Sequence, residues 1–101
     1  MVKHVIMWKL KDEASGRTKF ENAKMIKEKL EALVGVVSEI KSLEVGINID
    51  CGDECAYDAC LISEFDDFDA LNRYKIHPEH KKVSEFIKDI RISRTAVDYE
   101  F

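Results

Sequence analysis

The chain has 101 residues, 46% of them hydrophobic and 36% charged, and its net charge at pH 7 is −4. This length suits one domain spanning residues 1–101, and the scattered basic residues argue against a nucleic-acid-binding protein, because binding phosphates requires Lys and Arg on one face. No stretch approaches the ~20 apolar residues that cross a bilayer, and the N-terminus reads as a strand and not as a signal peptide, so we expect no membrane association and a cytoplasmic location.

Residues 2–11 predict a β-strand whose side chains alternate between two faces. One face carries His4, Ile6, Trp8 and Leu10, and the other carries Val5, Met7 and Lys9. Since both faces hold apolar side chains near the centre of the strand, we expect other parts of the protein to cover each face.

A helix is predicted after a polar segment that breaks the strand pattern. Ser15 or Thr18 is suited to cap this helix, and Glu21 completes a capping box with Thr18. Apolar residues then recur at helical spacing, namely Phe20, Ala23, Leu30, Leu33, Val34 and Val37. Gly35 predicts that the helix ends at about Val34.

Two further strands are predicted at residues 40–49 and 57–65, joined by a loop that contains Cys51 and Cys55. With Cys60 in the second strand, the cysteines are odd in number, which argues against a pure disulfide framework. A zinc site would need about four ligands, and no second Cys or His pair lies nearby. We therefore expect reduced thiols that bind no metal, with Cys60 acting as a small hydrophobic residue.

The last part of the chain predicts two helical segments and a strand. Asp66 and Asp67 are suited to cap a helix that continues to Ile76. Pro78 cannot continue that helix, but it suits the first turn of a second segment, which is predicted to reach about Ile90. A final strand follows at residues 94–101. The order β-α-β-β-α-β predicts an α+β, ferredoxin-like fold: a four-stranded antiparallel sheet with the helices on one face.

The other face of this sheet is expected to be apolar. Val5 and Met7 lie there in the first strand, and Cys60 and Ile62 lie there in the third. An exposed patch of this kind is uncommon on a monomer, so we predict a homodimer in which the two sheets pack face to face. A monomer with a mildly apolar outer face is the alternative.

The second helical segment carries an imidazole on its inward face. His80 is followed at helical spacing by Val83, Ile87 and Ile90. Tyr74 follows Phe68 and Leu71 in the same way and should also point inward. Histidine titrates near neutral pH, so His80 is a candidate proton carrier. The alternative is that His80 is a hydrogen-bonded core residue. His4, inward by alternation, either orients His80 or fills the space beside it.

Four segments together resemble the stress-responsive A/B barrel domain family, which consists of dimeric α+β barrels. The segments are Val2–Ile6, Glu44–Gly46, Tyr74–His80 with its His-Pro-Glu-His run, and Val97–Tyr99. The resemblance covers essentially the whole chain, from Val2 to Phe101. It implies a dimeric α/β barrel with a cavity between the sheet and the helices of each subunit.

The resemblance also implies site residues. One plant branch of the family includes a polyketide cyclase, which closes a linear poly-β-keto thioester by aldol condensation. Its catalytic histidine and tyrosine match His80 and Tyr74, and a pocket histidine matches His4. Some plant members resemble cation binders through backbone carbonyls, which would here belong to Val34, Val37 and Ile40.

These residue types suit proton removal next to a carbonyl group, with His80 as the base and Tyr74 as the donor to the developing oxyanion. We expect an apolar pocket, lined also by His4, Trp8, Val83 and Ile87, that binds a small carbonyl compound; the chemistry requires neither a metal nor an organic cofactor. Two alternatives stay open. One is a dimer that binds a small ligand, or acts in stress, without catalysis. The other is a monooxygenase without cofactor, suggested by fold analogy alone.

Overall fold

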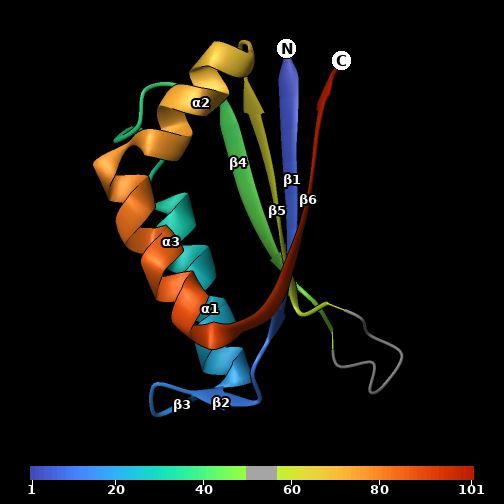
Figure 1. Ribbon diagram of the computed structural model, residues 1–101, viewed down its shortest axis with the longest axis vertical. Coiled ribbons are helices and arrows are strands. Elements are labelled where there is room, and N and C mark those ends of the chain that lie inside the picture. Colours follow the sequence, from blue (N-terminus) through green and yellow to red (C-terminus); the bar gives the residue numbers. More distant parts are fainter. Residues whose placement is uncertain (50–56) are drawn as a thin grey trace.

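The computed structural model describes residues 1–49 and 57–101. Four long strands form an antiparallel sheet in the order β4-β5-β1-β6, and the helices lie on one side of it (Figure 1). The elements are β1 (Val2–Leu10), β2 (Glu13–Ala14), β3 (Arg17–Thr18), α1 (Lys19–Glu31), β4 (Ser42–Ile47), β5 (Ala59–Phe65), α2 (Phe68–Ile76), α3 (Pro78–Ile90) and β6 (Arg91–Glu100). The predicted ferredoxin-like α+β fold is confirmed. The predicted loop containing Cys51 and Cys55 lies largely outside the described residues.

β1 lies between β5 and β6 and carries several of the side chains that face the helices. Its alternate residues are buried under the helices, namely Val2, His4, Ile6, Trp8 and Leu10. The intervening side chains, among them Val5 and Met7, are half-buried on the opposite face. The predicted alternation is therefore present, with a covered inner face and an apolar outer face.

The predicted capping box starts α1. The Glu21 N–H donates to Thr18 Oγ1 at 3.3 Å, and the Thr18 N–H donates to Glu21 Oε1 at 3.0 Å. The helix ends at Glu31, earlier than the predicted end near Val34. After Glu31 the backbone tightens into turns with i to i+3 hydrogen bonds, and Gly35 then adopts a φ of +87°. The apolar periodicity continues through these turns, which is why the sequence suggested a longer helix.

The junction between α2 and α3 is held by capping. Asp67 accepts from the Ala70 N–H at 2.8 Å and starts α2. His77 Nδ1 accepts from the Glu79 N–H at 3.1 Å, so this histidine caps α3, with Pro78 at the first helical position. The division at Pro78 was predicted, and it sets the position of His80 relative to Tyr74.

Residues 13–18 form a small hairpin, β2–β3, that the sequence did not predict. Ser15 and Gly16 at its turn both have positive φ, as a tight two-residue hairpin requires. β6 also begins at Arg91, directly after α3, and not at the predicted residue 94.

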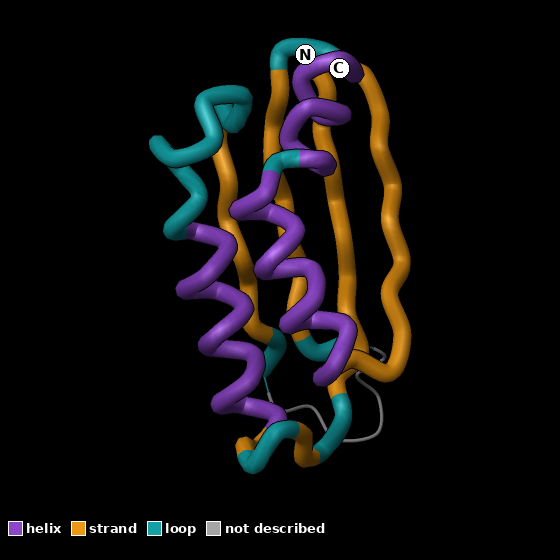
Figure 2. The backbone as a smooth tube through the Cα atoms, turned by 60° about the vertical axis from the view of Figure 1, so that its left-hand side comes forward, coloured by secondary structure: helices purple, strands orange, loops and turns teal. Residues whose placement is uncertain are grey.

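The helices cover the sheet unevenly. α1 packs against β4, α2 packs against β1 and β5, and α3 packs against α1. β6 forms the edge of the sheet opposite to β4 (Figure 2).

Within the described ranges no helix has the length and apolar character needed to span a membrane. The cytoplasmic location stays a prediction.

Candidate functional site

A cavity of about 210 Å³ lies between the helices and the sheet, bounded on one side by β6. Its apolar lining consists of Ile6, Trp8, Leu30, Leu61 and Ile87, and its polar lining consists of Tyr74, His80, Ser84, Lys88, Arg91 and Arg94. Organic ligand sites typically occupy ~300–1,000 Å³, so this cavity suits a small molecule.

The structure brings together four of the six residues expected to form the site. Trp8, Tyr74, His80 and Ile87 line the cavity, whereas His4 and Val83 are not among its lining residues. Val83 is buried and lines a different groove with Leu33 and Val36, next to α1. An α-helix turns by ~100° per residue, so Val83 is displaced from His80 by about 60° and Ile87 by only about 20°. The expectation that Val83 lines the cavity of His80 was therefore wrong.

His80 lies in the first turn of α3 and is half-buried. Its Nδ1 is 3.0 Å from the carbonyl oxygen of Lys75. A carbonyl only accepts, so Nδ1 carries the proton and Nε2 has a free lone pair. Burial lowers the pKa of His80, and this outweighs the hydrogen bond to Lys75, which raises it; the positive charge of Arg94 lowers the pKa further. His80 is therefore a neutral imidazole near pH 7 with a fixed tautomer.

Tyr74 is fully buried, with an exposed fraction of 0%. Its ring centroid is 4.3 Å from that of His80 and 5.0 Å from that of Phe65. In the part of the chain that the structure describes, its hydroxyl has no hydrogen-bond partner. Burial raises the pKa of the phenol, which keeps it protonated. An unpaired buried hydroxyl costs about 1–3 kcal/mol, so this phenol lowers the stability of the fold as long as nothing pairs with it.

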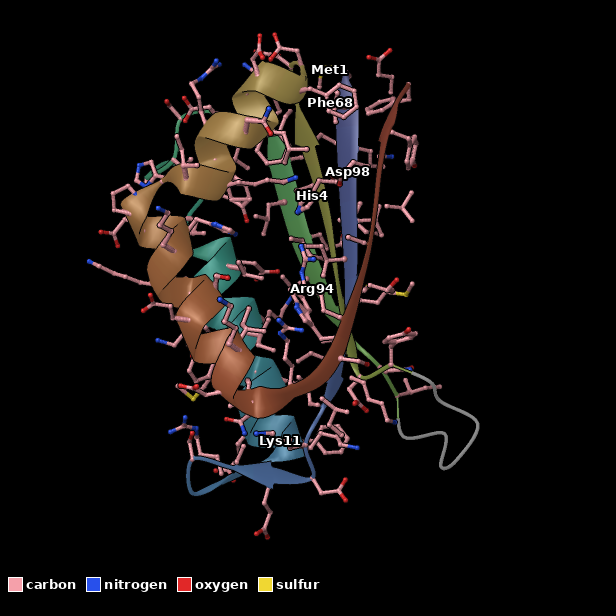
Figure 3. The ribbon with its side chains drawn as sticks, in the orientation of Figure 1. Met1, His4, Lys11, Phe68, Arg94 and Asp98 are labelled. Carbon is pink, nitrogen blue, oxygen red and sulfur yellow. The ribbon has the colours of Figure 1, made fainter. Side chains whose placement is uncertain are left out.

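His4 lies behind Tyr74 and not at the cavity wall. The two rings meet edge to face with centroids 6.2 Å apart. His4 Nδ1 is 2.5 Å from Asp98 Oδ1 on β6, and Asp98 Oδ2 is 3.4 Å from Lys75 Nζ. Figure 3 shows His4 and Asp98 next to each other on the helix side of the sheet. His4 therefore supports the ring of Tyr74 from the sheet side.

The pair formed by His4 and Asp98 consists of a neutral imidazole and a carboxylate. Burial lowers the pKa of His4, although the hydrogen bond to Asp98 acts in the opposite direction. Burial opposes ionisation of Asp98, but the hydrogen bond from His4 and the nearby Lys75 ammonium outweigh it and lower the pKa of Asp98. His4 thus donates from Nδ1 to a charged acceptor, a strong form of hydrogen bond.

Sequence reasoning missed Asp98 and the cations Lys88, Arg91 and Arg94. Alternation along β6 puts Asp98 on the opposite face from Val97 and Tyr99, but only the strand register pairs it with His4. The same register pairs Arg94 with Trp8 and so turns Arg94 toward the helices (Figure 3).

Metal ligands are not gathered at this site. Within residues 1–49 and 57–101, no group of three His, Cys, Asp or Glu side chains is placed to hold a metal ion. Of the backbone carbonyls suggested by resemblance, that of Val37 accepts from the Ile40 N–H at 3.2 Å. Cys60, the one cysteine in the described ranges, is a free thiol on β5.

Comparison with known proteins decides the family. The model of the stress responsive A/B barrel domain matches residues 2–101. The chain belongs to this family. An uncharacterised protein of Streptomyces coelicolor is 32% identical over 101 residues, which cover 100% of both chains.

Solved structures of similar proteins share the fold of this chain. A dimeric protein of unknown function with a ferredoxin-like fold, from Bacteroides fragilis, is 37% identical with a TM-score of 0.87; the match covers 99% of this chain and 95% of that one. A hydroxynitrile lyase from Passiflora edulis has a TM-score of 0.77 over 97% of this chain and 90% of its own, and its 16% identity shows a shared fold alone.

Proposed function

We propose that this protein is a small enzyme in which His80 removes a proton from the carbon next to a carbonyl group while Tyr74 donates a hydrogen bond to the carbonyl oxygen. The observation that carries this proposal is that Tyr74, whose buried hydroxyl has no partner among the described residues, lines the same cavity as His80. Buried hydroxyl groups are hydrogen-bonded in the large majority of native proteins, so an unpaired one supports a site that a bound molecule completes.

His80 has the properties of a general base. Its hydrogen bond to the Lys75 carbonyl fixes the ring and leaves Nε2 as the acceptor. Its lowered pKa keeps it unprotonated near neutral pH. A base with these properties typically contributes a factor of about 10²–10⁴ to the rate.

Tyr74 supplies the complementary donor. Because burial raises the pKa of the phenol, it stays protonated and can donate to the oxygen that gains negative charge in the enolate. The contacts of the Tyr74 ring with Phe65 and His4 hold it in place before the substrate binds. The resemblance to a polyketide cyclase suggests the same roles for these two residues, but the cavity of about 210 Å³ favours a smaller carbonyl compound than a long polyketide.

Exchange of α-hydrogens for deuterium tests this proposal without knowledge of the natural product. A panel of small ketones and oxo acids, including levulinate (4-oxopentanoate), is incubated with the protein in D₂O, and loss of the α-proton signals is followed by NMR. We expect faster exchange than in buffer for at least one compound, and His80→Gln should reduce it at least about 100-fold. Glu85→Gln, an exposed change on the same helix, is the matched control.

The result also separates the alternative functions. A compound that binds the cavity without any exchange above the buffer rate would contradict catalysis and favour a ligand-binding protein. Consumption of oxygen with quinol-like compounds would instead support a monooxygenase without cofactor. No feature of the cavity favours that second reaction over proton transfer.

We also propose that two copies pair through the outer face of the sheet, closing the predicted barrel. Ile62 is 41% exposed and Val97 is 56% exposed on this face. Val97 pairs with Val5 in the register of the sheet, so the exposed apolar residues of β5 and β6 continue the half-buried ones of β1. The description of the Bacteroides fragilis protein as dimeric supports this pairing.

Light scattering after size exclusion tests the dimer. At micromolar concentration we expect a particle with twice the 11.7 kDa mass of the chain. Val97→Glu should yield monomers because it places a charge in the apolar contact. Ile76→Glu, at a position 67% exposed on α2, should leave the dimer intact. A monomeric parent protein would contradict the proposal.

A further inference from the structure

The cavity of His80 and Tyr74 has a strongly positive lining. Lys88, Arg91 and Arg94 all border it, and none of its lining residues is acidic. This arrangement is unexpected in a chain whose net charge is −4. Lys88 and Arg94 are exposed and Arg91 is half-buried, so water screens part of their mutual repulsion, and a bound anion would reduce it further.

The two arginines at the cavity differ from the other two arginines of the chain. Arg17 Nε donates to Asn22 at 2.9 Å, and Arg73 Nε pairs with Glu39 at 3.2 Å. By contrast, Arg91 and Arg94 have neither a hydrogen bond from the side chain nor an ion pair with any residue in the described ranges. The guanidinium groups without partners are thus the ones that border the cavity.

Local structure explains two of the three cations. Lys88 lies in the last turn of α3 and Arg91 at its C-terminal cap, where positive charge interacts favourably with the helix dipole. Arg94 has no such explanation. It lies within β6, opposite Trp8, and its side chain points toward the helices. Its charge also acts on the buried His4 and the half-buried His80 and makes their protonation less favourable.

We propose that the cavity binds a small carboxylate, with Arg94 as the principal anchor and Arg91 beside it. This inference rests on the proposed function for the identity of the second group, because Tyr74 and His80 are then placed at a carbonyl of the same molecule. The substrate class is therefore a short oxo acid. A guanidinium binds a carboxylate through two parallel hydrogen bonds, so the anchor fixes orientation as well as position.

The anchored substrate gives a balanced reaction. His80 Nε2 takes the α-proton, the electron pair of the C–H bond forms the C=C bond of the enolate, and the carbonyl π electrons move to the oxygen that accepts from Tyr74. Return of a proton from His80 to carbon regenerates the oxo acid. The carboxylate stays bound to Arg94 throughout and takes no part in bond changes.

Two molecules of the same size that differ in charge test the inference, namely levulinate and its neutral amide, 4-oxopentanamide. Binding is followed through the NMR signals of the Trp8 indole and the His80 ring at constant ionic strength, so that screening is the same in both titrations. We expect levulinate to bind at least about tenfold more tightly than the amide, and Arg94→Gln to remove this preference. Lys24→Gln, which removes one exposed positive charge from α1, should preserve it.

The outcomes for this inference and for the proposed function are distinguishable. Equal binding of levulinate and its amide, or an unchanged preference in Arg94→Gln, would overturn the carboxylate anchor even if α-exchange is catalysed. Preferential binding of levulinate that depends on Arg94, without catalysed exchange of any compound, would support the anchor and overturn the proposed catalysis.

Discussion

The rings of Tyr74 and His80 have centroids 4.3 Å apart, although the two residues lie on different helices. The short distance depends on the junction between the helices, where the cap formed by His77 and the ring of Pro78 end one helix and start the next. A continuous helix would hold the two side chains at fixed angles around one axis. The break allows a phenol and an imidazole to border one cavity.

Tyr74→Phe should separate stability from function. The substitution removes a buried hydroxyl that has no partner in the described part of the chain, so the free energy of unfolding should stay the same or rise by about 1 kcal/mol. The exchange rate should fall by a factor of about 10²–10³, because the donor to the enolate oxygen is lost. Urea denaturation and the deuterium assay measure the two effects. Tyr99→Phe on β6 serves as the control, and a variant that exchanges as fast as the parent would contradict the role of the phenol.

The exchange rate should rise with pH on the acid side. The active form of His80 is neutral, and burial lowers its pKa from the ordinary 6.5, so the midpoint of the rise should lie below pH 6.5. The raised pKa of Tyr74 predicts no loss of activity up to about pH 10. Initial rates measured from about pH 5 to 10 check this profile.

The dependence of the exchange rate on pH also tests whether the charge of Arg94 acts on His80. Its charge contributes to the lowering of the pKa of His80, so Arg94→Gln should move the midpoint to higher pH. Titration of the His80 ring signals by NMR gives this shift directly. A midpoint that moves to lower pH, or not at all, would show that the charge of Arg94 does not reach the base.

Folding stability should fall as the solution becomes more acidic. The pKa values of both His4 and His80 are lower in the folded state than the ordinary 6.5, so the unfolded chain binds more protons just below pH 6.5. Stability therefore rises with pH through that window and is fully present above pH 6.5. Urea denaturation at fixed protein concentration should show a lower free energy of unfolding at about pH 5 than at about pH 7.5. The difference should be smaller in His80→Gln.

Asp98→Ala should destabilise the fold more than its partly exposed position suggests. The substitution leaves the Nδ1–H of His4, which is 2% exposed, without its acceptor. The expected loss is about 1–3 kcal/mol of unfolding free energy, and Asp98→Asn should lose less because it keeps an acceptor. Glu100→Ala on the same face of β6 is the control. If Asp98→Ala and Glu100→Ala are equally stable, the pair with His4 contributes nothing to folding.

Local patterns were sufficient for much of the fold and for the centre of the site. The alternation of β1, the box formed by Thr18 and Glu21 and the break at Pro78 depend on neighbouring residues, so the sequence contains them. His80 and Tyr74 were also predictable from neighbouring residues, because helical spacing alone assigns each of them to an inward face.

The parts that were missed depend on contacts between distant segments. Asp98 contacts His4 only because β6 pairs with β1 in one register, and periodicity within a strand cannot give that register. Arg94 borders the cavity for the same reason. Val83 was assigned to the cavity because helical spacing identifies an inward face but does not say which part of that face meets α1 and which part meets the sheet.

The position of Arg94 on an edge strand has a second consequence. β6 is the last strand of the sheet, and its outer edge offers backbone N–H and C=O groups to any extended chain that approaches. Charged residues directed inward on such a strand make the addition of a foreign strand costly, and β6 carries several of them. We therefore expect the arginine assigned to recognition to disfavour fibrous self-association as well, so that variants that neutralise it aggregate more readily during expression and storage.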